Sequence, residues 1–238
     1  MEAAEKNREA LFRETDFLSG GGEFRGSPWD IVWRDPHYES RGKTALPPPM
    51  MQKAMTEVLT RGTPRGKAAV YIHIPFCATR CSYCDFYSQT NSALRSEYIQ
   101  ALIAEMSIRR AEVTDTIGTL YFGGGTPSLL SPQEIGRIIE QVYRLFSFSS
   151  DAEITLEANP DDLNTSYVQE LRTLPINRIS MGAQSFHDED LHFLNRRHNA
   201  RQVLEAVDTC RNAGLTNLSI DLIYGLPGQT PARWQENI

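Results

Sequence analysis

The sequence predicts an α/β protein built on a parallel β-sheet. From residue 68 onward, short runs rich in β-branched and aromatic residues alternate with longer segments whose apolar residues recur three and four positions apart. These are the periodicities of strands and helices, respectively. The alternation occurs about five times, and repeated β-α units form a parallel sheet with right-handed crossovers. The distinctive polar residues follow the strands, where such folds place their sites.

Five strands and the helices between them can be placed on the sequence. The first helix begins near Leu94, and Ser-Pro-Gln-Glu at 131–134 is a capping box that begins the second. Asn164 and Asn199 are the N-caps expected for two later helices, the second of which ends at Gly214. The strands are expected at 68–74, 117–122, 153–156, 178–181 and 218–224.

Residues 1–66 differ from the rest of the chain. They contain a glycine triplet, a proline triplet, many charges and little hydrophobic periodicity. This composition predicts a polar, flexible extension, and a start site assigned too early would also explain it. Residues 67–238 then form the core domain. A sixth element begins near Trp234, so we expect this domain to be incomplete at its C-terminus.

The composition narrows the class of protein. The 238 residues carry a net charge of -6, which argues against a general nucleic-acid binder. No apolar run approaches the roughly 20 residues that a transmembrane helix needs, and the N-terminus lacks the pattern of a secretory signal. Three of the four cysteines lie within eight positions, which is not the pattern of a disulfide framework. We therefore expect a cytoplasmic protein.

The most informative motif is C-x3-C-x2-C, formed by Cys77, Cys81 and Cys84 directly after the first strand. Three thiolates this close suit three irons of a [4Fe–4S] cluster. The fourth iron would lack a protein ligand and could bind and activate a small molecule. Arg80, between two of the cysteines, is expected to help hold the negative charge of the thiolates.

A zinc site is the main chemical alternative for these cysteines. Structural zinc normally takes four protein ligands, and the fourth could be His73, although it lies within a predicted strand. Cys210 lies on the apolar stripe of a helix and is expected to be a small buried hydrophobic residue.

Polar residues also follow the other strands. The glycines at 123–125 let a backbone approach a ligand closely, or make only a tight turn. Glu157 and Asp221 are carboxylates in apolar strands, where burial is costly without a partner. Each could pair with Arg178 or Arg196, or both could bind the hydroxyl or amino groups of a ligand.

Two further positions lie at the same level of the predicted sheet. Gln184 is a neutral polar residue directly after the fourth strand. Arg196 and Arg197 follow it along the chain and could be no more than a solvated helix end.

These motifs resemble those of radical S-adenosylmethionine (SAM) proteins, whose signature is three cysteines at this spacing. The surrounding sequence resembles the oxygen-independent coproporphyrinogen III oxidase family and, within it, the haem-chaperone branch termed HemW. The resemblance covers about residues 68–238 and is carried by segments 71–76, 84–86, 122–127, 153–160, 184–186 and 221–227.

The resemblance implies a partial (β/α)6 radical-SAM barrel, truncated here after about five β-α units. Cys77, Cys81 and Cys84 would be the cluster ligands, and SAM would bind the open iron. One electron from the cluster would then cleave SAM to methionine and a 5′-deoxyadenosyl radical. The SAM contacts carried over position by position would be Tyr71, Tyr83, Gly124, Gly125, Thr126, Glu157, Gln184, Arg196 and Asp221.

Phe86 distinguishes two functions that the resemblance allows. The oxidases carry a further cysteine at this position, two residues after the third. Its replacement by Phe86 favours the chaperone, which would bind haem, deliver it to acceptor proteins and use a reductant protein such as flavodoxin or ferredoxin. The alternatives are oxidative decarboxylation of coproporphyrinogen III in porphyrin biosynthesis, or radical-SAM methylation and ring opening of haem. No residue of this chain is assigned to haem.

Overall fold

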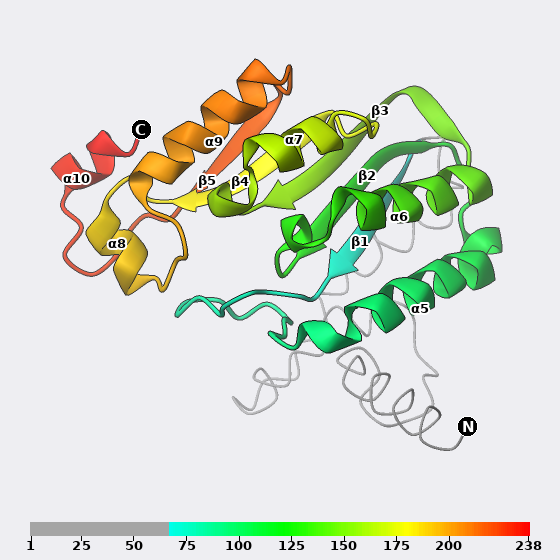
Figure 1. Ribbon diagram of the computed structural model, residues 1–238, viewed down its shortest axis with the longest axis horizontal. Coiled ribbons are helices and arrows are strands. Elements are labelled where there is room, and N and C mark those ends of the chain that lie inside the picture. Colours follow the sequence, from blue (N-terminus) through cyan, green and yellow to red (C-terminus); the bar gives the residue numbers. More distant parts are fainter. Residues whose placement is uncertain (1–66) are drawn as a thin grey trace, which may run out of the picture. The chain divides into compact units, whose positions relative to one another are not determined.

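The computed structural model describes residues 67–238, and their fold is α/β with one parallel sheet (Figure 1). The sheet has five strands in the order β1-β2-β3-β4-β5, and each neighbouring pair is parallel. This confirms the predicted fold class. The strands are β1 (Ala68–Ile74), β2 (Ile117–Gly124), β3 (Phe148–Ala158), β4 (Arg178–Gln184) and β5 (Leu218–Leu222).

Helices connect successive strands, and four of them lie along one face of the sheet (Figure 1). Because each strand pairs with the next one along the chain, right-handed crossovers carry every connection over the same face. These four are α5 (Arg95–Ile108), α6 (Pro132–Leu145), α7 (Thr165–Leu171) and α9 (Ala200–Asn212). The shorter elements are α8 (Asp188–Phe193), α10 (Pro231–Glu236) and the 3-10 helices η1 (Ser92–Leu94), η2 (Arg109–Glu112), η3 (Pro127–Leu129) and η4 (Pro160–Asp162).

The predicted helix starts are confirmed. Ser131 accepts a hydrogen bond from the Glu134 backbone N–H, and Glu134 bonds back to Ser131, which completes a capping box at the start of α6. Asn164 caps α7 and Asn199 caps α9, each through its side-chain oxygen. These bonds satisfy backbone N–H groups that a helix start leaves without a partner.

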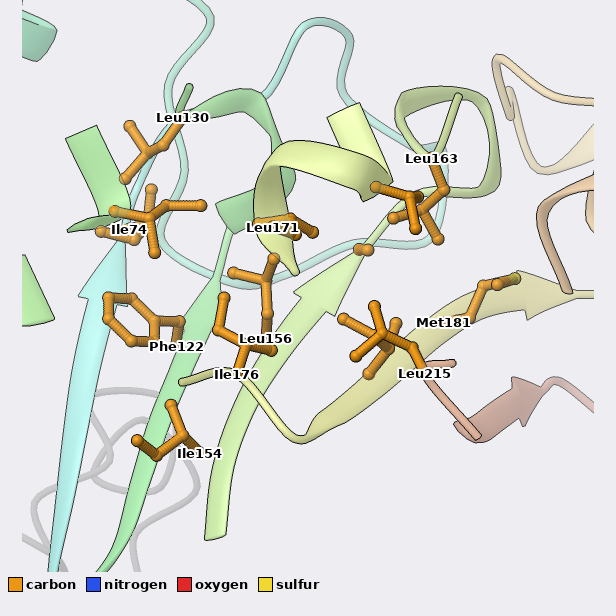
Figure 2. Packing of buried hydrophobic residues seen from close by; sticks show 14 of the residues in the cluster. Ile74, Phe122, Leu130, Ile154, Leu156, Leu163, Leu171, Ile176, Met181 and Leu215 are labelled. Carbon is orange, nitrogen blue, oxygen red and sulfur yellow. The ribbon is translucent and has the colours of Figure 1, made fainter. Parts of the chain in front are cut away.

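The core lies between the sheet and these helices. Alternate residues of each strand turn toward it, for example Ile72 and Ile74 on β1. Leu156 on the central strand β3 is fully buried and lies among core residues from several elements (Figure 2). Cys210 of α9 is also fully buried there, and burial raises the pKa of its thiol to about 11. This agrees with the prediction that Cys210 is a buried hydrophobic residue.

The other face of the sheet carries polar and aromatic side chains at each strand. They are the residues that alternate with the core positions, so they follow from the period of two in a strand. This face includes Tyr71, His73, Tyr121, Thr155, Glu157, Ser180 and Asp221.

Parallel register aligns the ends of the strands. Ile74 of β1 lies opposite Gly124 of β2, and Glu157 of β3 lies opposite Ser180 of β4. The segments that follow these strands therefore begin at the same edge of the sheet.

The predicted strand bounds differ most for β3. It begins at Phe148, which pairs with Ile117 of β2, whereas the sequence predicts a strand at 153–156. The added residues include Ser149 and Asp151, which are exposed or half-buried and show no apolar alternation. β5 is shorter than predicted and ends at Leu222.

The predicted extension, residues 1–66, lies outside the described residues, and the boundary at 66/67 stays a prediction. Within residues 67–238, no helix has the length and apolar character that crossing a membrane would require.

We expect Leu156→Ala to destabilise the domain by about 2–5 kcal/mol, because it removes buried methyl groups and leaves a cavity in the core. Urea unfolding followed by circular dichroism measures this change. Leu204→Ala is the matched control: Leu204 is 58% exposed on α9, so we expect only a small change there. Equal effects of the two substitutions would contradict the assignment of Leu156 to the core.

Candidate functional site

A pocket of about 430 Å³ lies at the edge of the sheet where the strands end. Its lining comes from the segment after β1, the glycines of β2 and the residues that follow them, the ends of β3, β4 and β5, and the segment between α8 and α9, which contributes Arg196 and Arg197. All of the predicted site residues except Tyr71 line it: Cys77, Tyr83, Cys81, Cys84, Gly124, Gly125, Thr126, Glu157, Gln184, Arg196 and Asp221.

Tyr71 is the predicted contact that does not line the pocket. Its ring stacks on that of Tyr121, with ring centroids 5.9 Å apart, on the polar face of the sheet. A Cβ at Gly123 would lie 2.7 Å from the Tyr71 ring, so this glycine permits the packing.

The three cysteines are free thiols in the segment after β1, and all are partly exposed. The backbone N–H of Cys77 donates to the carbonyl of Gln89 at 2.9 Å. The N–H of Cys84 donates to the carbonyl of Cys81 at 3.3 Å. These bonds turn the cysteine segment back on itself beside the pocket.

The cysteine segment is also fastened to the end of α8, far away in the sequence. Ser82 donates from its backbone N–H to the Leu194 carbonyl at 3.1 Å and from its hydroxyl to the Phe193 carbonyl at 2.9 Å. The Asn195 side chain donates to the Arg80 carbonyl at 2.8 Å. Asn195 has a positive φ of 55°, a conformation that asparagine tolerates better than most residues.

The glycine segment approaches the cysteine segment too closely for larger residues. Gly124 has a φ of 115°, and a Cβ there would lie 2.7 Å from the His73 ring. A Cβ at Gly125 would lie 2.8 Å from the Phe76 carbonyl oxygen and 3.0 Å from the Cys77 sulfur. The Thr126 hydroxyl contacts that same sulfur at 3.6 Å. The glycines are therefore required for this close approach and make more than a tight turn.

The three cysteines that line the pocket fit a multi-iron cluster. Within residues 67–238, no group of three or more His, Cys, Asp or Glu side chains is placed to hold one metal ion. Zinc would require its cysteine sulfurs about 2.3 Å from one point. In a four-iron cluster each thiolate binds a different iron, so three cysteines need only surround a larger volume, and here they line one pocket.

Glu157 is held by neutral donors. The Tyr121 hydroxyl donates to it at 2.8 Å, and the Gly124 backbone N–H donates at 3.2 Å. Burial raises the pKa of Glu157, and these two hydrogen bonds oppose the shift. Burial and the hydrogen bond to Glu157 raise the pKa of Tyr121 to about 12.

The carboxylates do not form the ion pairs that the sequence left open. Glu157 has the partners given above, and the polar contact of Asp221 is the Ser180 hydroxyl at 3.4 Å. Asp221 is exposed, so the expected cost of burying it does not arise. Arg178 instead lies 4.0 Å from Glu153.

Arg196 is a central residue of the site, and the reading of it as a solvated helix end is wrong. Its guanidinium donates to the Cys81 sulfur at 3.2 Å, the Tyr83 hydroxyl at 3.4 Å and the Gly182 carbonyl at 2.6 Å. It also donates to the Asn159 side-chain oxygen. The arginine that contacts a cysteine sulfur is thus Arg196, where the sequence suggested Arg80.

His198 lies behind this site and is 3% exposed. Its Nε2 is 3.0 Å from the Ala183 carbonyl, one residue before Gln184, which has a φ of 70°. Burial lowers the pKa of His198 to about 4, and the nearby Arg196 and Arg197 act in the same direction. The imidazole is therefore neutral at pH 7 and donates from Nε2.

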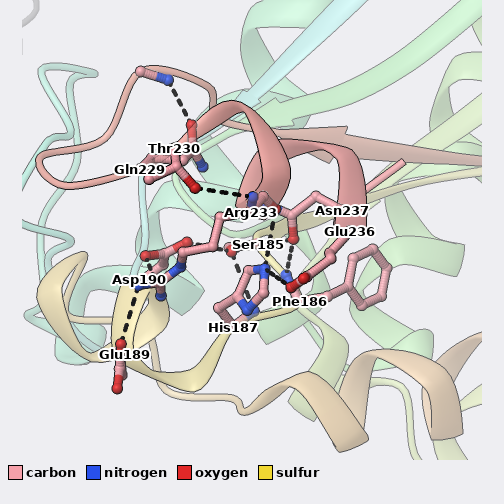
Figure 3. A network of polar contacts seen from close by, with 11 residues as sticks. Ser185, Phe186, His187, Glu189, Asp190, Gln229, Thr230, Arg233, Glu236 and Asn237 are labelled. Atoms are coloured by element: carbon pink, nitrogen blue, oxygen red, sulfur yellow. Dashed lines mark hydrogen bonds and ion pairs between the residues drawn. The ribbon is translucent and has the colours of Figure 1, made fainter.

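A second polar network fastens the segment after β4 to α10 (Figure 3). Arg233 bonds to Glu189 at 3.1 Å and to the nearly buried Asp190 at 3.0 Å. The Asn237 side-chain oxygen accepts from the Phe186 backbone N–H at 2.7 Å and from the Ser185 hydroxyl at 3.3 Å. The network fixes the backbone that follows Gln184 at the rim of the pocket.

Several residues that support the site were not singled out from the sequence, among them Asn159, Tyr121 and Asn195. Asn159 follows β3 at the ligand-binding edge, so its position in the predicted fold could have indicated it. Tyr121 is two positions before Gly123, which places both on one face of β2. Asn195 has no comparable signal, because its partner Arg80 is 115 positions away in chain order.

Comparisons with known proteins agree with this geometry. Residues 71–238 match the model of the radical SAM superfamily. The chain is 38% identical over 174 residues to the haem chaperone HemW of Bacillus subtilis and 40% identical over 164 residues to that of Lactococcus lactis. These matches cover 71% and 68% of this chain but 46% and 42% of the relatives. The chain thus spans about half the length of these curated relatives.

A solved structure is also similar. It is coproporphyrinogen III oxidase (HemN) from Escherichia coli, described as a radical SAM enzyme. The TM-score is 0.69 with 29% sequence identity, and the match covers 84% of this chain and 48% of the oxidase.

We expect stability to fall on acidification between about pH 6.5 and pH 4, in part because of His198. In this window the unfolded chain binds a proton at this histidine and the folded chain does not, since burial lowers its folded pKa to about 4. Unfolding free energies measured by urea titration across the window should show this slope.

His198→Gln keeps a donor for the Ala183 carbonyl without a titrating ring, so we expect a shallower slope for that variant. His192→Gln is the matched control for the substitution itself, because His192 is exposed on α8. An unchanged slope in His198→Gln would contradict the buried neutral state of His198.

Proposed function

The chain belongs to the radical SAM superfamily, and on this premise we propose that it is a haem chaperone of the HemW type. It would hold a [4Fe–4S] cluster and SAM, bind haem and transfer the haem to acceptor proteins. The observation that carries the proposal is the single pocket where the three cysteines, the glycine segment and Phe86 meet.

The cluster would be held by Cys77, Cys81 and Cys84. When bound, the cluster and SAM supply one-electron chemistry that side chains alone cannot provide. Arg196 offers positive charge beside Cys81, and Glu157 and Asp221 offer negative charge across the same pocket. Such a set complements the carboxylate, amino and hydroxyl groups of SAM. The remaining SAM contacts would be Tyr83, Gly124, Gly125, Thr126 and Gln184, with Tyr71 on the adjacent face of the sheet.

Phe86 favours the chaperone over the oxidase. It is 70% exposed and lines the pocket where the oxidase branch would present a further cysteine. A phenyl ring cannot ligate iron or donate a proton, so chemistry that needs a thiol at this position would be lost. The similarity to two HemW chaperones supports the same choice. The second candidate is coproporphyrinogen III oxidation, which the likeness to the E. coli oxidase supports.

The proposed cellular setting follows from the cofactor. A [4Fe–4S] cluster with an open iron suits the reducing cytoplasm, and a flavodoxin or ferredoxin would supply the electron.

Anaerobic reconstitution with iron and sulfide is expected to give about four irons per chain, iron–thiolate visible absorbance and a reduced EPR signal that SAM alters. Cys81→Ala should abolish the SAM response and most of the cluster. Cys210→Ala is the matched control, since Cys210 is buried in the core away from the pocket. An intact SAM-responsive cluster in Cys81→Ala would contradict the ligand assignment, and bound zinc without iron or sulfide would contradict the cluster.

The chaperone and oxidase functions are separated by supplying each substrate to the reconstituted chain. We expect haem to bind, as measured by a shift of its Soret band and by transfer to an apo-haem protein. We expect coproporphyrinogen III, given anaerobically with SAM and dithionite, to remain unconverted. Formation of protoporphyrinogen IX in multiple turnovers would overturn the chaperone proposal in favour of the oxidase.

A further inference from the structure

Two adjacent arginines serve different partners at the rim of the pocket. Arg196 reaches the Cys81 sulfur, as described above, whereas Arg197 turns to η4. There its guanidinium lies 3.3 Å from Asp161 and 2.9 Å from Asp162. The Arg197, Asp161 and Asp162 side chains are 22%, 17% and 12% exposed. This ion cluster is thus largely shielded from water, and charges in such a place are costly unless they are paired.

Hydrogen bonds connect this ion cluster to Asn159. The buried Ser128 hydroxyl donates to the second oxygen of Asp162 at 2.6 Å. The same hydroxyl oxygen accepts from the Asn159 backbone N–H at 3.1 Å. The Asp162 backbone N–H in turn donates to the Asn159 carbonyl at 3.1 Å. Asn159 is therefore fixed from both sides of its backbone.

Asn159 presents its side-chain oxygen to Arg196. One terminal nitrogen of the Arg196 guanidinium donates to that oxygen and to the Gly182 carbonyl, and the other reaches the Cys81 sulfur. Because a guanidinium is planar and rigid, fixing one nitrogen sets the direction of the other. The orientation of the N–H that points at the sulfur thus depends on Asn159.

We propose that Arg197 is a positioning residue for the iron–sulfur cluster. By clamping Asp161 and Asp162, it fixes Asn159, which holds the Arg196 guanidinium against the Cys81 sulfur. The inference rests on the part of the proposed function in which Cys81 ligates the cluster.

The expected consequence is a change in the reduction potential of the cluster. Reduction adds an electron, so a cationic N–H donor at a ligand sulfur stabilises the reduced state and raises the potential. If Arg196 loses its orientation, the potential becomes more negative. Arg197 lines the same pocket but touches no cysteine within residues 67–238, so the proposal requires its effect on the potential to pass through Arg196. A direct effect of the Arg197 charge would add to that of Arg196.

A double-mutant cycle tests this dependence. Four proteins are reconstituted with the cluster: the unsubstituted chain, Arg196→Gln, Arg197→Gln and the double variant. Each is titrated with a reductant, and the EPR signal measures the fraction of reduced cluster. We expect both single variants to shift the midpoint potential in the negative direction. We expect the double variant to match Arg196→Gln, because residues that act through one contact are not additive.

Two controls separate positioning from general destabilisation. Arg95→Gln breaks an ion pair with Glu134 that is also partly buried (36% and 19% exposed) but lies between α5 and α6. It should leave the potential unchanged. Ser128→Ala removes the hydroxyl that joins Asp162 to Asn159 and keeps the ion cluster, so it should shift the potential in the same direction. If Arg197→Gln does not fold, the midpoint potential of Ser128→Ala still tests the proposal.

The outcomes distinguish the inference from the proposed function. If the unsubstituted chain assembles no cluster, the proposed function fails. If it assembles a SAM-responsive cluster and neither Arg197→Gln nor Ser128→Ala shifts the potential, the positioning role is overturned. Additive shifts in the double variant would also overturn it, because Arg197 would then act independently of Arg196.

Discussion

The parallel register of the five strands is the constraint on which the rest of the structure depends. It brings the segments after β1, β2, β3, β4 and β5 to one edge, where the pocket lies. Alternation along each strand then divides the side chains between two environments: apolar residues turn to the helices, and polar residues turn to the opposite face. A slip of one residue in β3 would exchange Leu156 with Glu157. The same strand register therefore determines which residues form the core and which face the site.

Close approach of backbone segments completes the site. Gly124 and Gly125 lie against His73 and Cys77 at distances that leave no room for a Cβ. Opposite them, the end of α8 holds the cysteine segment through backbone carbonyls, and Arg196 contacts a cysteine sulfur. The cysteines are thus supported by parts of the chain that follow them by dozens of residues. A cysteine site built in this way needs the folded domain around it.

Polar groups near the pocket are held mainly by neutral partners and by one shielded ion cluster. Glu157 uses a tyrosine hydroxyl and a backbone N–H, and His198 uses a backbone carbonyl. The shielded ion cluster consists of Arg197 paired with Asp161 and Asp162 near the rim of the pocket. These contacts give most of the buried polar groups a hydrogen-bond or ion-pair partner. They also fix the orientation of the groups that face a ligand.

The resemblance to radical SAM proteins supplied many of the predicted residues that line the pocket. The sequence by itself determined the fold class, the helix caps and the cysteine motif, because strand and helix periodicity, capping residues and C-x3-C-x2-C are local patterns. It did not reveal the partners of those residues. The roles of Asn195 and Arg197 depend on contacts between segments far apart in the chain. Tyr71 is on the expected strand yet packs beside the pocket. Only the tertiary structure decides such contacts, since side-chain packing across strands leaves no periodic signal in the sequence.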